Sequence, residues 1–527
     1  PGWRADLIKA AQVPSMALAW FVDMSRRPIW TWLPWMPAIV ALELASAATV
    51  FWPVPRTVAT VIAGLIMLIV AWRRPSIGLA ALLLELAIGS KGALLKIPNG
   101  WEVDGGTSLR IVLVAAFLVG WAVNAILYWR TRRTELVTTI RREIRGRWAW
   151  IALVALTAWA VVRGISLKNG AVFSDANAWG FLALLLPVID IASRDGTRLV
   201  RHAGSALIAG LLWLPAKTLA LLYVWSHGIA SLSKPMYLWA RRSGVAEVTL
   251  VTGNLFRVFI QSQVFAIAGL LASVARVVTG PKDRTRALTF LVAIMASVSL
   301  LISLSRSFWI GLFAGCLTLA ALALSGRGAL RRLGSLLGFG VAAAVCALGL
   351  IAAVVAFPYP YVDVGSLKTL FSSRGGVTDA AAESRWNLLP VLGDKILEAP
   401  ILGSGFGATV TYASKDPRVL ADHPDGMYTT YAYEWGWLDH WIKFGVLGIP
   451  LMLWLLLSIL QRLWKTDGAW WLRAGFVSSL VALSILHVFT PYLNHPLGFG
   501  FLLAAEGWIT ARRTSRPTSA SSPPVAP

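Results

Sequence analysis

Apolar runs of about 20 residues recur along this chain and constrain its fold more than any other feature. A bilayer core takes about 20 apolar residues per helix. Unsatisfied backbone polar groups are costly in lipid, so such runs form helices rather than open sheets. With 57% hydrophobic residues and only 14% charged residues, the chain is too apolar for a soluble globular protein of this length. We therefore expect an all-α fold, a polytopic transmembrane helical bundle.

The sequence predicts about 12 to 14 membrane spans and one large external loop that contains short helices. Fourteen segments qualify as candidate spans: 35–52, 57–72, 76–95, 108–129, 148–165, 177–193, 203–226, 260–279, 286–304, 307–326, 333–357, 444–461, 469–489 and 496–511. They divide the chain into transmembrane helices with short loops (1–357), a large periplasmic loop (358–443), C-terminal transmembrane helices (444–513) and a disordered Ser/Pro/Ala-rich tail (514–527).

The net charge of +23 is explained by where the basic residues lie. Alternate connections and tails hold 29 of the 48 Lys and Arg residues, and most of these connections are short. Basic residues favour the cytoplasmic side and attract anionic lipid. This placement favours a topology signal over nucleic-acid binding. It puts both termini in the cytoplasm and the connections around 98–107, 166–176, 227–259 and 358–443 outside.

The loop 358–443 carries the densest set of polar groups able to act on a substrate. A loop this long inside a compact protein is usually functional or disordered, and its Trp, Tyr and Gly residues argue against disorder. Around Arg385, apolar residues recur at helical spacing, and we expect Pro390 to interrupt this helix. The segment Pro400–Gly407 is expected to be a flexible glycine-rich turn rather than a phosphate cradle, because it lacks the Lys-Ser/Thr of a nucleotide-binding loop.

Arginines on the external side are suited to a substrate that carries a diphosphate. Arg257 precedes the eighth span, Arg306 lies in a polar turn between two spans, and Arg385 lies in the large loop. A guanidinium pairs with phosphate oxygens and can stabilise charge on a leaving diphosphate. The competing interpretations are that Arg257 extends from the membrane interface to water and that Arg306 only marks topology.

A general base would be needed to activate an acceptor hydroxyl, and His and Glu are suitable side chains. His423 and Glu434 are the candidates, although either could be an ordinary surface residue. The external loops contain no Asp-x-Asp cluster. We therefore expect an enzyme that uses no metal and no other cofactor.

The second half of the chain resembles the O-antigen ligase and O-antigen polymerase superfamily. The resemblance lies in five features from Arg257 to Gly448: Arg257 with the Phe and Gln/Ser positions that follow it, Ser305-Arg306-Ser307, Arg385-Trp386, Glu398-x-Pro400-x-x-Gly403-x-Gly405, and a large loop that ends in Gly445-x-x-Gly448. Each motif is weak alone, and their order and spacing are more specific.

This resemblance implies a polytopic glycosyltransferase of the bacterial inner membrane, active in lipopolysaccharide biosynthesis. The donor would be a glycan linked to polyprenyl (undecaprenyl) diphosphate, and the acceptor would be lipid A core or another glycan. Arginines similar to Arg257 and Arg385 would bind the diphosphate, and a loop histidine would assist transfer. The family histidine register falls on Glu434, whereas His423 stands further upstream, so the base remains open between these two residues.

Two other functions remain possible on the sequence alone. A transporter or flippase of lipid-linked oligosaccharides would use the intramembrane charges Glu43, Glu85 and Lys217 for coupling, whereas in the alternative these residues form structural ion pairs. A peptidoglycan polymerase of the shape, elongation, division and sporulation type also combines many spans with an external loop. Among the enzymes, an O-antigen ligase is expected first and a polymerase next.

Overall fold

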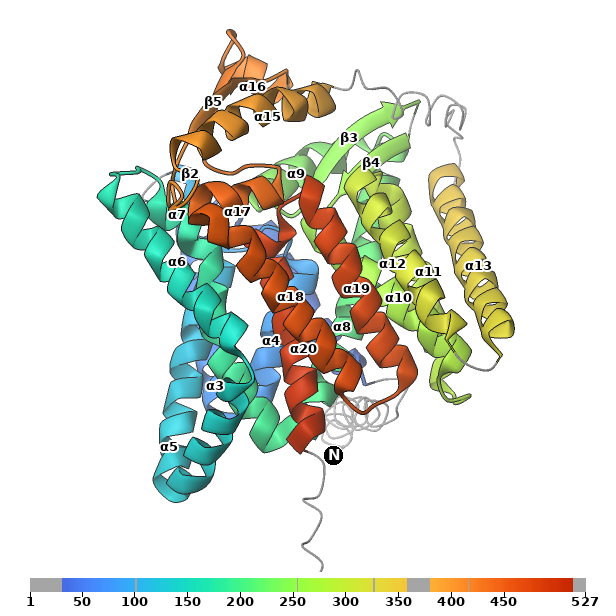
Figure 1. Ribbon diagram of the computed structural model, residues 1–527. Coiled ribbons are helices and arrows are strands. Elements are labelled where there is room, and N and C mark those ends of the chain that lie inside the picture. Colours follow the sequence, from blue (N-terminus) through green and yellow to red (C-terminus); the bar gives the residue numbers. More distant parts are fainter. Residues whose placement is uncertain are drawn as a thin grey trace, which may run out of the picture.

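The computed structural model describes residues 31–99, 102–253, 255–325, 328–357, 380–415 and 417–514. Within these residues, ten helical stretches are long and apolar enough to cross a membrane, and Leu33–Thr49 and Pro75–Ile88 are shorter apolar helices. The helices stand side by side in one bundle (Figure 1). The chain is a multi-pass membrane protein, as its composition predicts.

Each of the fourteen expected segments coincides with a helical segment. The bundle helices are α2 (Met36–Thr49), α3 (Pro53–Arg73), α4 (Pro75–Ile88), α5 (Leu109–Arg145), α6 (Trp148–Ser166), α8 (Leu185–Ser226), α10 (Val264–Thr279), α11 (Thr285–Ser303), α12 (Arg306–Leu324), α13 (Ala329–Ala356), α18 (Gly448–Lys465), α19 (Trp470–Phe489) and α20 (Pro496–Thr514).

Shorter elements connect these helices. They are α7 (Val172–Ala176), α9 (Ala230–Arg242), α15 (Ala380–Glu398), α16 (Pro417–Asp422), α17 (Gly436–Phe444) and the 3-10 turns η2 (Leu33–Trp35), η3 (Asn177–Leu184), η4 (Gln261–Gln263), η5 (Gly445–Leu447) and η6 (Tyr492–Asn494). Three antiparallel hairpins pair β1 (Lys96–Asn99) with β2 (Glu102–Ser108), β3 (Glu247–Thr252) with β4 (Leu255–Phe259), and β5 (Val410–Ala413) with β6 (Met427–Thr430).

Helix α8 accounts for two of the expected spans because it folds back on itself. At Asp195 the backbone leaves the helical region (φ −144°, ψ 41°). Before this bend, Asp190 accepts a hydrogen bond from Trp121 of α5 at 2.7 Å. After it, Lys217 donates to the carbonyl of Ile88 of α4 at 3.0 Å. The second arm runs along α4, from His202 beside Ser76 to Lys217 beside Ile88, and the chain before the bend runs along α20, from Trp179 beside Phe499 to Ala192 beside Thr514. Because α4 ends and α20 begins at the same end of the bundle (Figure 1), the two arms form a helical hairpin.

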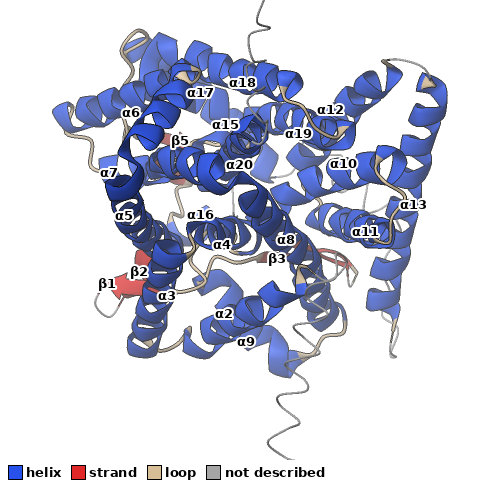
Figure 2. Cartoon of the chain, turned by 90° about the horizontal axis from the view of Figure 1, so that it is seen from below, coloured by secondary structure: helices blue, strands red, loops and turns tan. Residues whose placement is uncertain are grey.

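The two ends of the bundle differ. The hairpins, α9, α15, α16 and α17 lie at one end, here called the loop end (Figure 1). The basic connections after α5, α10, α12 and α18 lie at the opposite end, here called the basic end. Residues 1–30 and most of the expected disordered tail lie outside the described residues, but Thr514 ends α20. Viewed from the basic end, α13 occupies one edge of the bundle (Figure 2).

The described part of the large loop packs around its own small apolar core. This core consists of Leu388, Leu392, Ala408, Val410, Tyr433 and Ile442. The prediction that Pro390 interrupts the helix was wrong, because α15 continues through it to Glu398. Pro390 is exposed, whereas Leu388 and Leu392 on either side of it are buried. Their packing outweighs the local cost of the proline.

Candidate functional site

Arg257 lies on the hairpin at the loop end, in β4, opposite Thr249 of β3. Its guanidinium carbon stands 4.7 Å from the ring centre of Phe259, and its Nε donates to the carbonyl of Ser303 at 2.8 Å. Alternation along the strand places Arg257 and Phe259 on one face, which allows this stacking. The arginine is therefore tied to the end of α11.

The turn between α11 and α12 places Arg306 three residues after Ser303, whose carbonyl accepts from Arg257. Leu304 adopts a left-handed conformation (φ 44°), which reverses the chain within two residues. Arg306 is then the first residue of α12 and is exposed. The Ser305 and Ser307 hydroxyls lie 3.2 Å apart beneath it. Since Ser303 accepts from Arg257, the strand and the turn form one polar corner.

Arg385 and Glu434 meet in the described part of the large loop, where they form an ion pair. Both side chains are exposed, at 41% and 51%. Trp435 holds the backbone of Arg385 next to Glu434, because its indole nitrogen donates to the Arg385 carbonyl at 3.0 Å. The ring of Trp386 packs against Trp435 with centres 5.7 Å apart, and Trp386 is 55% exposed.

The end of α19 connects this ion pair to the α11–α12 turn. The rings of Trp435 and Phe489 lie 5.8 Å apart. The next residue, Thr490, donates from its hydroxyl to the Ser307 hydroxyl at 3.1 Å. Trp435 is next to Glu434 and Ser307 is next to Arg306, so these two contacts hold Glu434 and Arg306 at the same end of the bundle.

Tyr492 closes the corner from the other side. Its hydroxyl donates to the Gln261 carbonyl at 3.1 Å, and its ring lies 5.9 Å from that of Phe308. Burial raises the pKa of Tyr492, and the nearby Arg257 opposes this shift. The sequence analysis missed Thr490 and Tyr492. The available signal was the polar run 490–495 between two apolar helices, which follows the large loop and was not considered with it.

His423 is not brought to this corner by any described contact. It directly follows α16, and its side chain is exposed. Its backbone amide donates to the Val419 carbonyl at 2.7 Å, and its carbonyl accepts from Gly426 at 2.9 Å. Of the two candidate bases, Glu434 is therefore the one in contact with a candidate arginine.

The glycine-rich segment Pro400–Gly407 packs closely against α6 and α17, and this contact is here called the packing joint. Gly403, Gly405 and Gly407 all have positive φ, near 72°. A Cβ on Gly405 would lie 2.3 Å from the backbone nitrogen of Gly164 in α6, so only glycine fits there.

The backbone amides of this segment are already used. Ser404 donates to the Ile442 carbonyl at 2.6 Å, and Phe406 donates to the Ala160 carbonyl at 3.1 Å. Gly407 donates to Asp175 at 2.8 Å. Amides engaged in this way do not offer a phosphate cradle, so the geometry supports the structural interpretation over phosphate binding.

Beneath the joint lies a buried ionic cluster that the sequence analysis also missed. Lys443 of α17 donates to Asp175 at 2.5 Å and forms an ion pair with Asp439 at 2.8 Å. Asp439 also accepts from Asn494. All three charged side chains are buried. The cluster links α7, α17 and η6, and so fixes the base of the loop relative to the last helices.

The intramembrane charges are paired. Lys217 donates to Glu43 at 2.6 Å, and Arg110 donates to Glu85 at 2.8 Å. The expected pairing is present at these residues, although Glu85 pairs with an arginine that was not expected. Among the described residues, no group of three or more His, Cys, Asp or Glu side chains could hold a metal ion.

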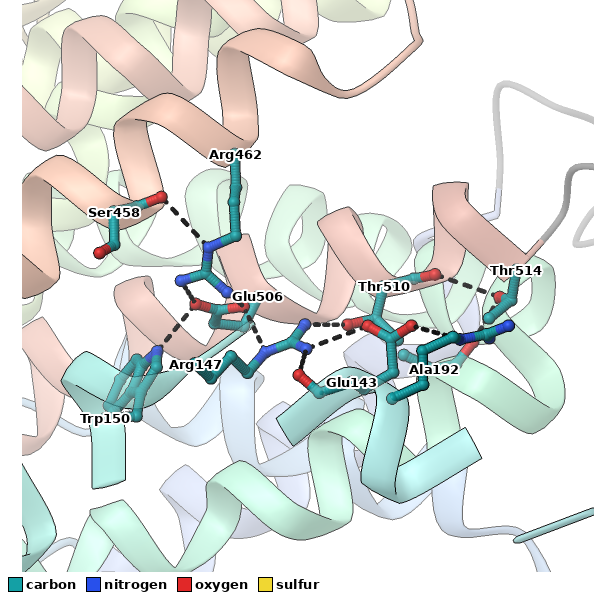
Figure 3. A network of polar contacts seen from close by, with 10 residues as sticks. Glu143, Arg147, Trp150, Ala192, Ser458, Arg462, Glu506, Thr510 and Thr514 are labelled. Carbon is teal, nitrogen blue, oxygen red and sulfur yellow. Dashed lines mark hydrogen bonds and ion pairs between the residues drawn. The ribbon is translucent and has the colours of Figure 1, made fainter. Parts of the chain in front are cut away.

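Glu506 lies at the centre of a further buried network towards the basic end (Figure 3). It accepts from Arg147 at 2.9 Å, from Arg462 at 2.5 and 2.9 Å, and from Trp150 at 2.8 Å. Arg147 also pairs with Glu143 at 3.0 Å. Two carboxylates thus balance two guanidinium groups. The side chain of Glu506 is fully buried.

Comparison with known protein families gives a match in the second half of the chain. Residues 290–453 match a family model described as O-Antigen ligase. The matched range runs from α11 into α18 and includes Arg306, Arg385, His423 and Glu434, whereas Arg257 precedes it. A search of curated proteins found no match. The resemblance to this family is confirmed for residues 290–453.

Proposed function

We propose that this chain transfers a glycan from a polyprenyl diphosphate donor onto a hydroxyl acceptor. The proposal starts from the match of residues 290–453 to the O-antigen ligase family. Ligation to lipid A core is the first candidate reaction, and polymerisation onto another glycan is the second. The reaction takes place at the loop end, which faces the periplasm. The protein lies in the bacterial inner membrane with its basic end and both termini in the cytoplasm, because basic connections favour that side.

The observation that carries this proposal is the joining of Arg257, the α11–α12 turn and the Arg385–Glu434 pair through Thr490 and Trp435. One guanidinium group can bind two phosphate oxygens through two parallel hydrogen bonds. A carboxylate beside such a group can take a proton from an acceptor. Both parts of a transfer reaction are therefore supplied at the loop end of the bundle.

In the proposed step, the acceptor oxygen attacks the anomeric carbon of the donor sugar. Its proton moves to Glu434, and the bond between the anomeric carbon and the phosphate oxygen breaks. The diphosphate leaves with the bonding electron pair, and Arg257, Arg306 and Arg385 stabilise its charge. The chain's own groups carry these roles, so we propose that neither a metal nor another cofactor is required.

The ion pair offers a way to release the Glu434 carboxylate only when the donor is present. An exposed pair such as Arg385–Glu434 contributes only about 0–1 kcal/mol, so a diphosphate can displace the carboxylate from Arg385. The released carboxylate is then free to accept the proton of the acceptor hydroxyl. Glu434 is therefore the preferred base, and His423 is the alternative.

The test is transfer by purified protein with lipid-linked glycan, lipid A core or glycan acceptor, and EDTA. Arg257→Ala and Arg385→Ala should each lower the rate by about 10²-fold or more, the usual loss for one charge-stabilising donor. Glu434→Gln should lower the rate by about 10²–10⁴-fold, whereas His423→Ala should not. Lys395→Ala is the matched control, because it breaks another ion pair on α15 (Lys395–Glu398, 2.6 Å).

Wild-type rates in Arg385→Ala would reject the proposal. Loss in His423→Ala with full activity in Glu434→Gln would move the base to His423. A protein that moves lipid-linked glycan across vesicles, and that tolerates Arg385→Ala but fails when Glu43 or Lys217 is neutralised, would be a flippase.

A further inference from the structure

A long apolar groove lies between four helices on the side of the bundle where α13 stands. Its volume is about 320 Å³, and α10, α11, α12 and α13 all contribute to its walls. Its walls include Leu300, Trp309, Cys316, Ala320, Leu336 and Gly340. No part of the candidate site lies inside this groove.

Helix α13 leaves the groove open because it packs through a narrow face. Its buried residues are Leu336, Ala343, Ala347 and Val355, which lie along one side of the helix. It runs along the edge of the bundle beside α11 (Figure 2). A Cβ on Gly340, which lines the groove, would meet no atom within 4 Å. The groove therefore has space next to its α13 wall.

The groove offers almost no hydrogen-bonding group to an occupant. Its walls are apolar except for Ser297 and Cys316. The Ser297 hydroxyl already donates to the carbonyl of Ala293 at 2.9 Å. The groove is therefore suited to a hydrocarbon chain and unsuited to a sugar.

The upper end of the groove meets the arginines of the candidate site. Trp309 stands one turn after Arg306 in α12, and its indole nitrogen donates to the Leu300 carbonyl at 3.3 Å. Leu300 precedes by three residues Ser303, whose carbonyl accepts from Arg257. From Trp309 to Ala320, the α12 wall runs roughly 16 Å, at 1.5 Å per residue. The groove thus descends into the membrane from the arginine corner.

We propose that this groove holds the polyprenyl chain of the donor while Arg257 and Arg306 bind its diphosphate, an inference that rests on the proposed function. The placement brings the sugar to the loop end and keeps the chain within the membrane. The donor then enters sideways from the bilayer, between α12 and α13.

Selection of this occupant comes from charge at the mouth and from the shape of the groove. Lipid tails are as apolar as the groove, so burial alone does not favour a polyprenyl chain over its bilayer surroundings. A diphosphate carries more charge than a phosphodiester headgroup and matches two arginines better. A phospholipid is therefore the competing occupant, and a polyprenol without its diphosphate should bind weakly.

Two glycines of α13 provide a matched pair of variants. Gly340→Phe places a ring in the groove. Gly338 lies two residues away, is exposed and does not line the groove, and a Cβ added to it would likewise meet no atom within 4 Å. Gly338→Phe adds the same ring to the same helix outside the groove. Any general effect of phenylalanine on α13 is common to both variants.

The experiment measures binding of undecaprenyl diphosphate to the purified full-length protein by native mass spectrometry, with undecaprenol and phosphatidylglycerol as comparison lipids. Gly340→Phe should weaken binding at least tenfold, Gly338→Phe should leave it unchanged, and Arg257→Ala should also weaken it. A photoreactive group on the chain should label peptides from α12 and α13.

Equal binding by the two phenylalanine variants, equal competition by phosphatidylglycerol, or labelling elsewhere in the bundle would overturn the proposal. The binding assay requires no transfer, so the two hypotheses can fail separately. Normal transfer in Gly340→Phe would reject the groove and leave the proposed function intact. Binding that depends on Gly340 and Arg257, without transfer to any acceptor, would reject the function instead.

Discussion

Replacing Glu506 by Gln should destabilise the bundle far more than a change of one atom suggests. Glu506 is fully buried and accepts hydrogen bonds from Arg147, Arg462 and Trp150. The amide keeps the size of the side chain but removes its charge, so Arg462 loses its carboxylate partner and Arg147 keeps only Glu143. Leaving a buried charge uncompensated costs about 3–5 kcal/mol. We expect a loss of this size in the free energy of unfolding.

The assay is unfolding by sodium dodecyl sulfate in mixed micelles, followed by circular dichroism. The control is Glu398→Gln, which removes an exposed partner of Lys395 and should change stability by about 0–1 kcal/mol. A double variant, Arg462→Leu with Glu506→Leu, restores charge balance and should recover much of the loss. Equal stability of Glu506→Gln and the control would refute the reasoning.

Further perturbations test other parts of the fold and the proposed chemistry. Gly405→Ala should lower the melting temperature because the methyl group meets the α6 backbone, whereas Gly393→Ala in α15, with no atom nearby, should raise stability by about 0.5–1 kcal/mol. Lys217→Met should destabilise by leaving the buried Glu43 carboxylate without its ammonium partner, measured by the same unfolding assay. Tyr433 donates to the Ala408 carbonyl at 2.6 Å, and burial raises its pKa. Its contribution is therefore complete below the unfolded value of about 10 and falls at higher pH, a slope that Tyr433→Phe should remove in a pH series of melting temperatures. EDTA should leave transfer unchanged, and inhibition reversed by added metal would contradict the proposed chemistry.

The helices could be predicted from the sequence because lipid forces almost every apolar run into one structure. The hairpin at Asp195 followed from two apolar runs separated by a short basic stretch. Pro390 was misjudged because local propensity was weighed without the packing of Leu388 and Leu392, which only the folded loop provides. The pairing of Glu85 with Arg110 was missed for a similar reason, since Arg110 was read only as the start of a span.

The candidate site could be predicted only in part. The arginines stood out as external charges, and chemistry suggested a diphosphate. Their mutual arrangement depends on Thr490 and Tyr492, which lie far along the chain and carry no motif. The choice between His423 and Glu434 also needed three-dimensional contacts, because both are polar residues of the same loop. Spacing alone does not reveal which of them meets Arg385.

The contacts of Thr490 and Tyr492 also bear on the order in which the protein is made. Arg257 and Arg306 enter the membrane while much of the chain is still on the ribosome. Ser307, next to Arg306, and Gln261, which follows the strand of Arg257, accept the hydrogen bonds from Thr490 and Tyr492 only after α19 has been inserted. A nascent chain that stops before α19 therefore carries every arginine of the site but lacks the contacts of Thr490 and Tyr492 that join the site. Assembly of the site is one of the last events of biosynthesis, so under the proposed function the lipid-linked donor would bind only to a nearly complete bundle.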